Sequence, residues 1–304
     1  MSLNASDTPD LIAEEPPSSN SPGHTLFLKI DLEIDRMGGK PAEPMTAVFA
    51  PDPKQLTTGN VDVLLWLHGD KDVWSRNRRG HLYLWGHSVR DYLQVDECKL
   101  REFILQTSKR QFLLVVPTLN DHTGRAKGHD AGGLLWQQDK AEAYLQQVLN
   151  GVKKYMGIGV TGLGNIVLAA HSGGGHIMGH MAQHFAGPFL KANEVWCFDC
   201  TYWGGDPFIT WAKKGHSNSK LWVYSTGGKG NGLTGDSANA ILSYSQTKAA
   251  AATNIEVLID DYPTPGKPSA TKFFVATYHG SAGGHYESLA KYLARLVTTS
   301  PNLN

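Results

Sequence analysis

The spacing of apolar residues changes after the first fifty positions of this chain. Residues 25–35 alternate apolar and polar side chains, and residues 45–50 form a second short apolar run. Alternation of this kind is typical of strands that are buried on one face. The two segments therefore predict an antiparallel start to a sheet.

Continuous apolar runs follow, and they indicate strands that are buried on both faces, as in a parallel sheet covered by helices. These runs lie at residues 61–67, 112–117, 165–170, 194–198, 221–224 and 273–276. Segments with helix-like spacing lie at residues 88–108, 138–156, 175–186, 237–252 and 287–297. The alternation of strand and helix predicts an α/β fold with a mostly parallel central sheet of about eight strands, flanked by helices. The apolar run 255–259 is an additional strand candidate without a predicted place in that sheet.

The first 23 residues differ from the rest of the chain. Residues 1–23 are rich in Ser, Pro, Asp and Glu and contain few large apolar side chains, which predicts a disordered or loosely attached arm. Residues 24–304 then form one domain. The connection 203–219 is too short for a helical cap domain, so a lid would have to come from residues 70–90 or 260–271.

Composition excludes some classes of protein. Hydrophobic residues make up 41% of the chain and charged residues 18%, which excludes global disorder. Lys plus Arg and Asp plus Glu number 28 each, so charge gives no reason to expect nucleic acid or an anionic membrane as partner. We find no apolar stretch of membrane-spanning length and no signal-peptide pattern at the N-terminus, and so expect a cytoplasmic protein by default.

The three cysteines cannot form a disulfide framework. Cys197 and Cys200 form a C-x-x-C pattern, which could indicate redox chemistry or half of a zinc site. No second C-x-x-C exists to complete four thiolate ligands, and the pair lies in an apolar run. A structural role is therefore the favoured interpretation.

The most informative local pattern is a serine at a strand–helix junction. The buried run 165–170 leads directly into His-Ser-Gly-Gly-Gly and then into helical spacing. The sharp turn needs small residues two positions on either side of the serine, and these are Ala170 and Gly174. The pattern resembles the nucleophile elbow of the α/β-hydrolases, with Ala in place of the first Gly, and implies that Ser172 is the nucleophile. A phosphate-binding loop is the alternative, but the Lys that such a loop carries is absent.

An oxyanion hole needs two backbone N–H donors, one of which follows the nucleophile, at Gly173. His68-Gly69 directly follows a predicted buried strand and resembles the His-Gly oxyanion loop of esterases and lipases. The resemblance implies the amide of Asp70 as the second donor. Gly69 and Lys71 remain open as alternatives.

The general base of the family lies between the last strand and the last helix. His285 stands immediately before a segment with helical spacing and follows two glycines, which resembles the Gly-His of α/β-hydrolases. His279 is the rival because it lies closer to the predicted strand end.

The triad acid should fall between the nucleophile and the base in chain order. Asp199 ends the apolar run 194–198 and is our preferred candidate, because a buried carboxylate at that point needs a partner such as an imidazolium. The usual family position, one strand later, implicates Asp236. Asp206 is a third candidate.

Three histidines form a competing candidate for a metal site. His176, His180 and His184 recur every four residues and so share a helix face. Zinc proteases combine such histidines with a glutamate, as H-E-x-x-H, and no glutamate stands between these three. Packed or partly exposed histidines are the favoured interpretation.

Together these motifs identify residues 24–304 as resembling a single α/β-hydrolase domain without a cap domain. The resemblance implies a serine hydrolase that cleaves an ester or amide bond through a Ser172–His285–Asp199 triad and an acyl-enzyme, with no metal or organic cofactor. Without a cap, we expect an open cleft that admits a bulky or polymeric substrate. The alternatives are a non-catalytic binding protein of the same fold and a metal-dependent enzyme built on the three helical histidines.

Overall fold

The computed structural model describes residues 3–19, 21–32, 45–56, 59–68, 89, 93, 100–107, 109–119, 135, 138–171, 174–175, 177–178, 181, 192–201, 204–213, 219–225, 234–247, 254–259 and 284–303. In the last helix, side chains are described from Tyr292 onward.

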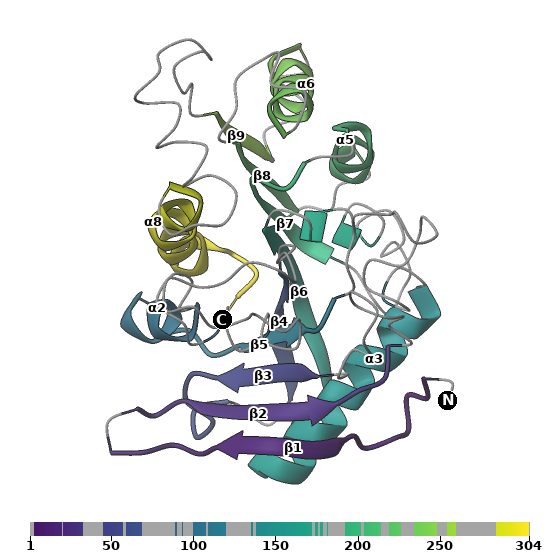
Figure 1. Cartoon of the computed structure of the whole chain (residues 1–304), viewed down its shortest axis with the longest axis vertical. Helices are drawn as coiled ribbons and strands as arrows, with labels where there is room; N and C mark the ends of the chain where they lie inside the picture. The colour runs from purple at the N-terminus through teal and green to yellow at the C-terminus, as the bar shows by residue number, and fades with distance from the viewer. Residues whose placement is uncertain are drawn as a thin grey trace, which may run out of the picture.

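Within these residues, nine strands form one sheet in the order β1-β2-β3-β5-β4-β6-β7-β8-β9 (Figure 1). The strands are β1 Asp10–Glu15, β2 His24–Lys29, β3 Thr46–Ala50, β4 Asn60–Leu67, β5 Leu113–Pro117, β6 Gly162–His171, β7 Ala192–Phe198, β8 Lys220–Ser225 and β9 Ile255–Ile259. The pairs β1–β2, β2–β3 and β3–β5 are antiparallel. Every pair from β5–β4 to β8–β9 is parallel. The predicted α/β class, with an antiparallel start and a mostly parallel sheet, is confirmed.

Two edge strands explain why the sheet has nine strands rather than about eight. At one edge, β1 lies within the segment that we predicted to be disordered. At the other edge, β9 is the apolar run 255–259, which pairs with β8 in parallel. The strand predicted at 273–276 lies outside the described residues. The segments 70–90 and 260–271 also lie almost wholly outside them, so the absence of a cap domain stays a prediction.

Helices cover both faces of the sheet (Figure 1). They are α2 Leu100–Thr107, α3 Gln138–Gly151, which continues as the π-helical η2 Val152–Met156, α5 Asp206–Lys213, α6 Thr234–Thr247 and α8 Gly284–Thr299. In none of the described segments is a helix both long enough and apolar enough to cross a membrane.

The period of two along each strand divides the core into two clusters. In β4, Leu65 packs on the face covered by α3, α5 and α6, whereas Leu64 and Trp66 pack on the face covered by α2 and α8. Because both faces are buried, the parallel strands carry the continuous apolar runs seen in the sequence.

The prediction that the N-terminal arm is disordered is wrong for the residues of the arm that the structure describes. Side chains of α3 and η2 donate hydrogen bonds to backbone carbonyls of the arm: Gln147 to Asn4 at 2.7 Å and Tyr155 to Pro9 at 3.0 Å. The arm then pairs with β2 as β1. Composition alone predicts disorder because the arm has little apolar surface to bury, but donors and a strand edge supplied by the rest of the chain hold its backbone.

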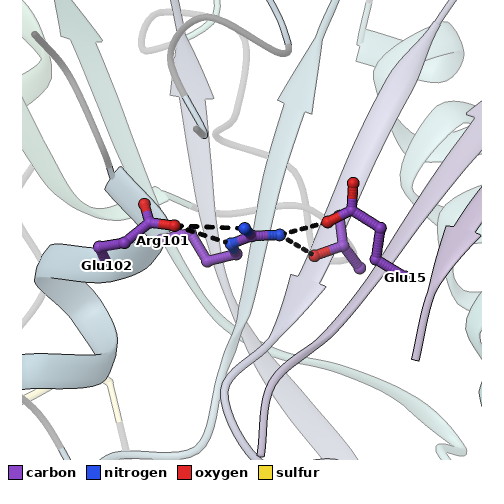
Figure 2. A network of polar contacts seen from close by, with 4 residues as sticks. Glu15, Arg101 and Glu102 are labelled. Atoms are coloured by element: carbon purple, nitrogen blue, oxygen red, sulfur yellow. Dashed lines mark hydrogen bonds and ion pairs between the residues drawn. The ribbon is translucent and has the colours of Figure 1, made fainter. Parts of the chain in front are cut away.

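Ion pairs add a second attachment between the arm and the domain. Arg101 of α2 donates to Glu15 of β1 at 2.5 Å and to Thr25 of β2 at 3.2 Å, and it also contacts Glu102 (Figure 2). One guanidinium therefore connects α2 to β1 and β2, the first two strands at one edge of the sheet. Its planar set of five donors allows this multiple contact.

We expect Arg101→Met to loosen β1 without unfolding the domain. Loss of the partly exposed pair with Glu15 should lower the free energy of unfolding by about 1 kcal/mol. Amide hydrogen exchange within β1 should become faster. Lys140→Met is the matched control because its contact with Asp139 is long, at 3.7 Å, and lies on α3. Equal exchange in β1 of the two variants would contradict this role of Arg101.

Candidate active site

The carboxyl ends of β4, β6, β7 and β8 meet at one edge of the sheet, because these strands are neighbours and parallel. Ligands of open α/β sheets bind outside this edge. Three of the predicted site residues follow these strand ends in the sequence: Ser172 and Gly173 after β6, and Asp199 after β7. Ser172 and Gly173 themselves lie outside the described residues, but the residues that precede and follow them are described.

The helix that follows β6 begins in a confined space. Gly174 and Gly175 are helical, and a Cβ atom at Gly174 would lie 2.8 Å from the carbonyl oxygen of His68. A Cβ atom at Gly175 would lie 2.6 Å from the carbonyl carbon of Cys200, and its nearest contact would be the carbonyl oxygen of that residue. Such approaches do not occur for real Cβ atoms, so glycine is required at both positions. The helix start is thereby held between the segments that follow β4 and β7.

His68 holds the segment after β4, where the predicted oxyanion loop begins. Its ring is buried, and its Nε2 accepts a hydrogen bond from the backbone N–H of Leu119 at 2.8 Å. A ring nitrogen that accepts a bond carries no proton, so the proton of the neutral ring is on Nδ1. The contact connects the ends of β4 and β5. Asp70, the predicted donor, and its alternatives Gly69 and Lys71 lie outside the described residues.

Asp199 directly follows β7 and is fully buried. Its backbone N–H donates to the carbonyl oxygen of Tyr224 at 2.9 Å, so the pairing with β8 continues one residue beyond the strand. Its φ of 48° is the only positive φ of a non-glycine residue among those that the structure describes. Such conformations cost free energy and gather at functional sites, although Asp tolerates this one better than most residues.

The position of Asp199 relative to the nucleophile follows from the strand register. His171 and Phe198 are Cα partners in the β6–β7 pair. These two residues immediately precede Ser172 and Asp199, so the chain leaves adjacent strands at the same level before each of them.

The other two candidate acids differ from Asp199 in burial. Asp236 lies in the first turn of α6 and Asp206 begins α5, and both are exposed. An exposed carboxylate at a helix N-terminus is already stabilised there by water and by the helix dipole. Burial therefore distinguishes Asp199 from its rivals.

The C-x-x-C pair brackets this aspartate. Cys197 and Cys200 are both free and buried. Burial raises the pKa of the Cys200 thiol well above its ordinary value, and the neighbouring Cys197 and Asp199 raise it further. A thiol that stays protonated is a poor nucleophile and a poor metal ligand, which agrees with the structural interpretation.

The predicted base is the second residue of α8. Only the backbone of α8 is described at His285, so the position of its imidazole stays a prediction. The helix packs with α2 on one face of the sheet through Leu293, Leu296 and Val297. The rival His279 lies outside the described residues.

A metal centre finds no support in the part of the chain that the structure describes. No group of three or more His, Cys, Asp or Glu side chains in that part could hold a metal ion. The three histidines at 176, 180 and 184 lie outside it, so the metal-dependent alternative stays a prediction.

The sequence pattern did not reveal two of these features. The carbonyl contact that requires Gly175 was missed, although the run of three glycines is the signal for it. The hydrogen bond that the His68 side chain accepts from Leu119 was also missed, because the resemblance to the oxyanion loop concerns only the position of His68 before Gly69.

No protein-family model matches the chain, and no curated protein matches it in sequence. Solved structures to which the chain is similar include brefeldin A esterase, a bacterial homologue of human hormone-sensitive lipase. It is 12% identical, with a TM-score of 0.42, over 94% of this chain and 79% of that one. Esterase B from Lactobacillus rhamnosis is 11% identical, with a TM-score of 0.43, over 93% and 90%. The acylaminoacyl peptidase of Pyrococcus horikoshii is 10% identical, with a TM-score of 0.38, over 95% and 55%. At such similarity these relationships carry no inference about substrate or activity.

The packing at the helix start predicts the effect of adding one methyl group. Gly175→Ala should lower the free energy of unfolding by about 2–3 kcal/mol, because the new Cβ meets backbone atoms that cannot move aside. Gly162→Ala is the control, since its Cβ would meet only the side chain of Asn60, which can rotate away. Urea unfolding of both variants measures the difference. Equal losses would show that the junction after β6 is not tightly confined.

Proposed function

We propose that this chain is a serine hydrolase in which Ser172 is the nucleophile, His285 the general base and Asp199 the acid that orients the base. The backbone amides of Gly173 and Asp70 form the proposed oxyanion hole. The observation that carries the proposal is the fully buried carboxylate of Asp199 at the end of β7, next to the end of β6.

The buried position suits a triad acid for an electrostatic reason. An ionised carboxylate without water is costly unless a positive or hydrogen-bonding partner compensates it. During acyl transfer, the imidazole of the base becomes an imidazolium, and a carboxylate that accepts the second ring N–H stabilises that charge. Water competes little at a buried position, so the attraction is stronger than at an exposed residue such as Asp236.

In the proposed reaction, His285 takes the hydroxyl proton of Ser172 while the serine oxygen attacks the carbonyl carbon of the substrate. The carbonyl oxygen becomes an oxyanion that the two backbone N–H groups stabilise. When the bond to the leaving group breaks, His285 returns the proton to the leaving oxygen or nitrogen, and an acyl-enzyme remains. Water then attacks the acyl carbonyl by the same path and releases the acid and the free serine.

The proposed substrate is an ester or amide with a bulky or polymeric partner on one side of the scissile bond. Its support is the short connection between β7 and β8, which contains only α5 among the described residues and favours the predicted absence of a cap domain. A strong preference for small esters that are fully enclosed on binding would contradict this part of the proposal.

The first test is covalent labelling. We expect a fluorophosphonate probe to add once to the peptide that contains Ser172, because an activated serine attacks the phosphorus and expels fluoride. Ser172→Ala should abolish the adduct. His285→Ala should slow its formation by about 10³-fold or more, because the base is lost. Intact-protein and peptide mass spectrometry measure both the site and the rate.

Failure of the wild-type protein to form this adduct, under conditions that label a control hydrolase, would contradict the proposal. The non-catalytic binding protein would then be favoured. Tightly held zinc found by elemental analysis of the same sample would instead favour the metal-dependent enzyme.

The second test separates the candidate acids. Asp199→Asn should lower the labelling rate and kcat by about 10³–10⁴-fold, because the amide cannot stabilise the imidazolium. Asn also tolerates the positive φ at this position, so the backbone is preserved better than with Ala. Asp236→Asn is the control and should leave both rates within about two-fold, because that side chain is exposed in α6.

The reverse result, a large loss in Asp236→Asn and none in Asp199→Asn, would assign the acid to Asp236, in the first turn of α6 after β8. Thermal unfolding of both variants checks that the losses do not come from unfolding.

A further inference from the structure

A group of aromatic side chains lies between the sheet and α8. The ring of Phe198 in β7 is 5.0 Å from the ring of Trp222 in β8. Tyr292 of α8 packs against both aromatic residues of β8, with ring centroids 5.3 Å from Trp222 and 5.0 Å from Tyr224. Tilted aromatic pairs at these distances stabilise contacts beyond their apolar area and have a defined geometry. The contact therefore fixes where α8 rests on β8.

Tyr224 also touches the proposed acid. Its backbone carbonyl accepts the hydrogen bond from the N–H of Asp199 at 2.9 Å, and its ring contacts Tyr292. One residue of β8 therefore contacts both the segment that carries the proposed acid and the helix that carries the proposed base.

Because α8 is one continuous helix, the contact at Tyr292 also affects the position of its N-terminal end. Tyr292 and His285 are seven residues apart in α8, which is two helical turns or about 10 Å along the axis. The guanidinium of Arg295 also lies over the ring of Tyr292, 5.8 Å from its centroid, and forms an ion pair with Glu256 of β9 at 2.6 Å. The ring of Tyr292 is thus held by both β8 and a side chain that is anchored on β9.

The far end of α8 is fixed independently. Arg110, just before β5, donates to the carbonyl oxygens of Thr298 at 2.9 Å and Ser300 at 2.5 Å. The side chain of Asn302 donates to the buried carboxylate of Glu194 at 2.9 Å. With this end attached, loss of the Tyr292 ring would let α8 tilt about its C-terminus, and the displacement would be largest at the N-terminal end.

From these contacts we propose that Tyr292 is a positioning residue: its ring, resting on Tyr224, sets the distance between α8 and the end of β7 and so holds His285 in register with Asp199. This inference rests on the proposed triad. The proposed role depends on the aromatic ring of Tyr292 and not on its hydroxyl group, so phenylalanine at this position should hold α8 equally well.

The test compares ring loss with ring retention. We expect Tyr292→Leu to lower kcat for p-nitrophenyl butyrate and the rate of fluorophosphonate labelling at Ser172 by about ten-fold, because small displacements of catalytic groups have large effects on rate. KM should change by less than about two-fold, since the role proposed for Tyr292 is to position the base and not to bind substrate. Tyr292→Phe should restore both rates to within about two-fold of wild type.

Phe112→Leu is the matched control. Phe112 is fully buried in the same core cluster, next to β5, which is four strands away from β8 in the sheet. Because Phe112 is fully buried and Tyr292 only partly buried, this variant should lower the melting temperature at least as much as Tyr292→Leu, but leave the labelling rate within about two-fold of wild type.

A folded Tyr292→Leu protein that labels as fast as Phe112→Leu would overturn the inference, as would a Tyr292→Phe protein as slow as Tyr292→Leu. If Tyr292→Leu does not fold, Tyr292→Met takes its place, because it keeps apolar volume but removes the ring, and the same comparison decides. Absence of wild-type labelling at Ser172 would overturn the proposed function and this inference together, which distinguishes the two failures.

Discussion

The helix after β6 begins where there is no room for a side chain, and the arrangement of the candidate site depends on that confinement. The backbone at Gly174 and Gly175 lies against the carbonyl groups that end β4 and begin the segment after β7. Because the helix start is held between these two strand ends, the segment after β4 and the aspartate after β7 are brought to the same place. Glycine is needed here for close approach of backbone to backbone, and the described neighbours supply the walls on both sides.

The same crowding explains the unusual backbone at Asp199. In a regular strand, side chains alternate between faces, and Cys197 and Phe198 do so. Continued alternation would place Cys200 with Phe198 on the α8 face, yet it packs in the cluster of Cys197 on the opposite face. The left-handed conformation of Asp199, with φ of 48°, interrupts the period of two and accounts for this return. The aspartate therefore occupies the point at which the chain stops behaving as a strand and turns toward the helix after β6.

Much of this architecture could be predicted from the sequence, because continuous apolar runs and a glycine-rich turn have direct physical meanings. The strands β2 to β8 coincide with predicted runs, and the helices α2, α3, α6 and α8 overlap predicted segments. The strand β1 could not be predicted, because it is held by pairing with β2, and the residues before it are held by donors such as Gln147 and Tyr155 that are distant in sequence. The position of β5 between β3 and β4 in the sheet could not be predicted either, because local sequence patterns do not determine the order of strands. For the site, the sequence predicts that Asp199 stands at the end of a strand. Its burial and its backbone conformation could not be predicted, because they depend on residues that pack around it from distant parts of the chain.

The proposed nucleophile and the proposed base are carried by helices on opposite faces of the sheet. The geometry of the proposed triad therefore depends on contacts that connect the two faces. The helix after β6 packs with α3 on one face through Ile177 and Met178, whereas α8 packs on the other face. The proposed nucleophile and base are therefore carried by elements that pack on opposite faces of the sheet, so their relative position depends on the sheet between them. Within the sheet, Tyr224 connects the end of β7 to α8, because it contacts the first by its backbone and the second by its ring. A change on either face can be absorbed by local repacking, but a change in this contact alters the separation of the two faces at the site itself.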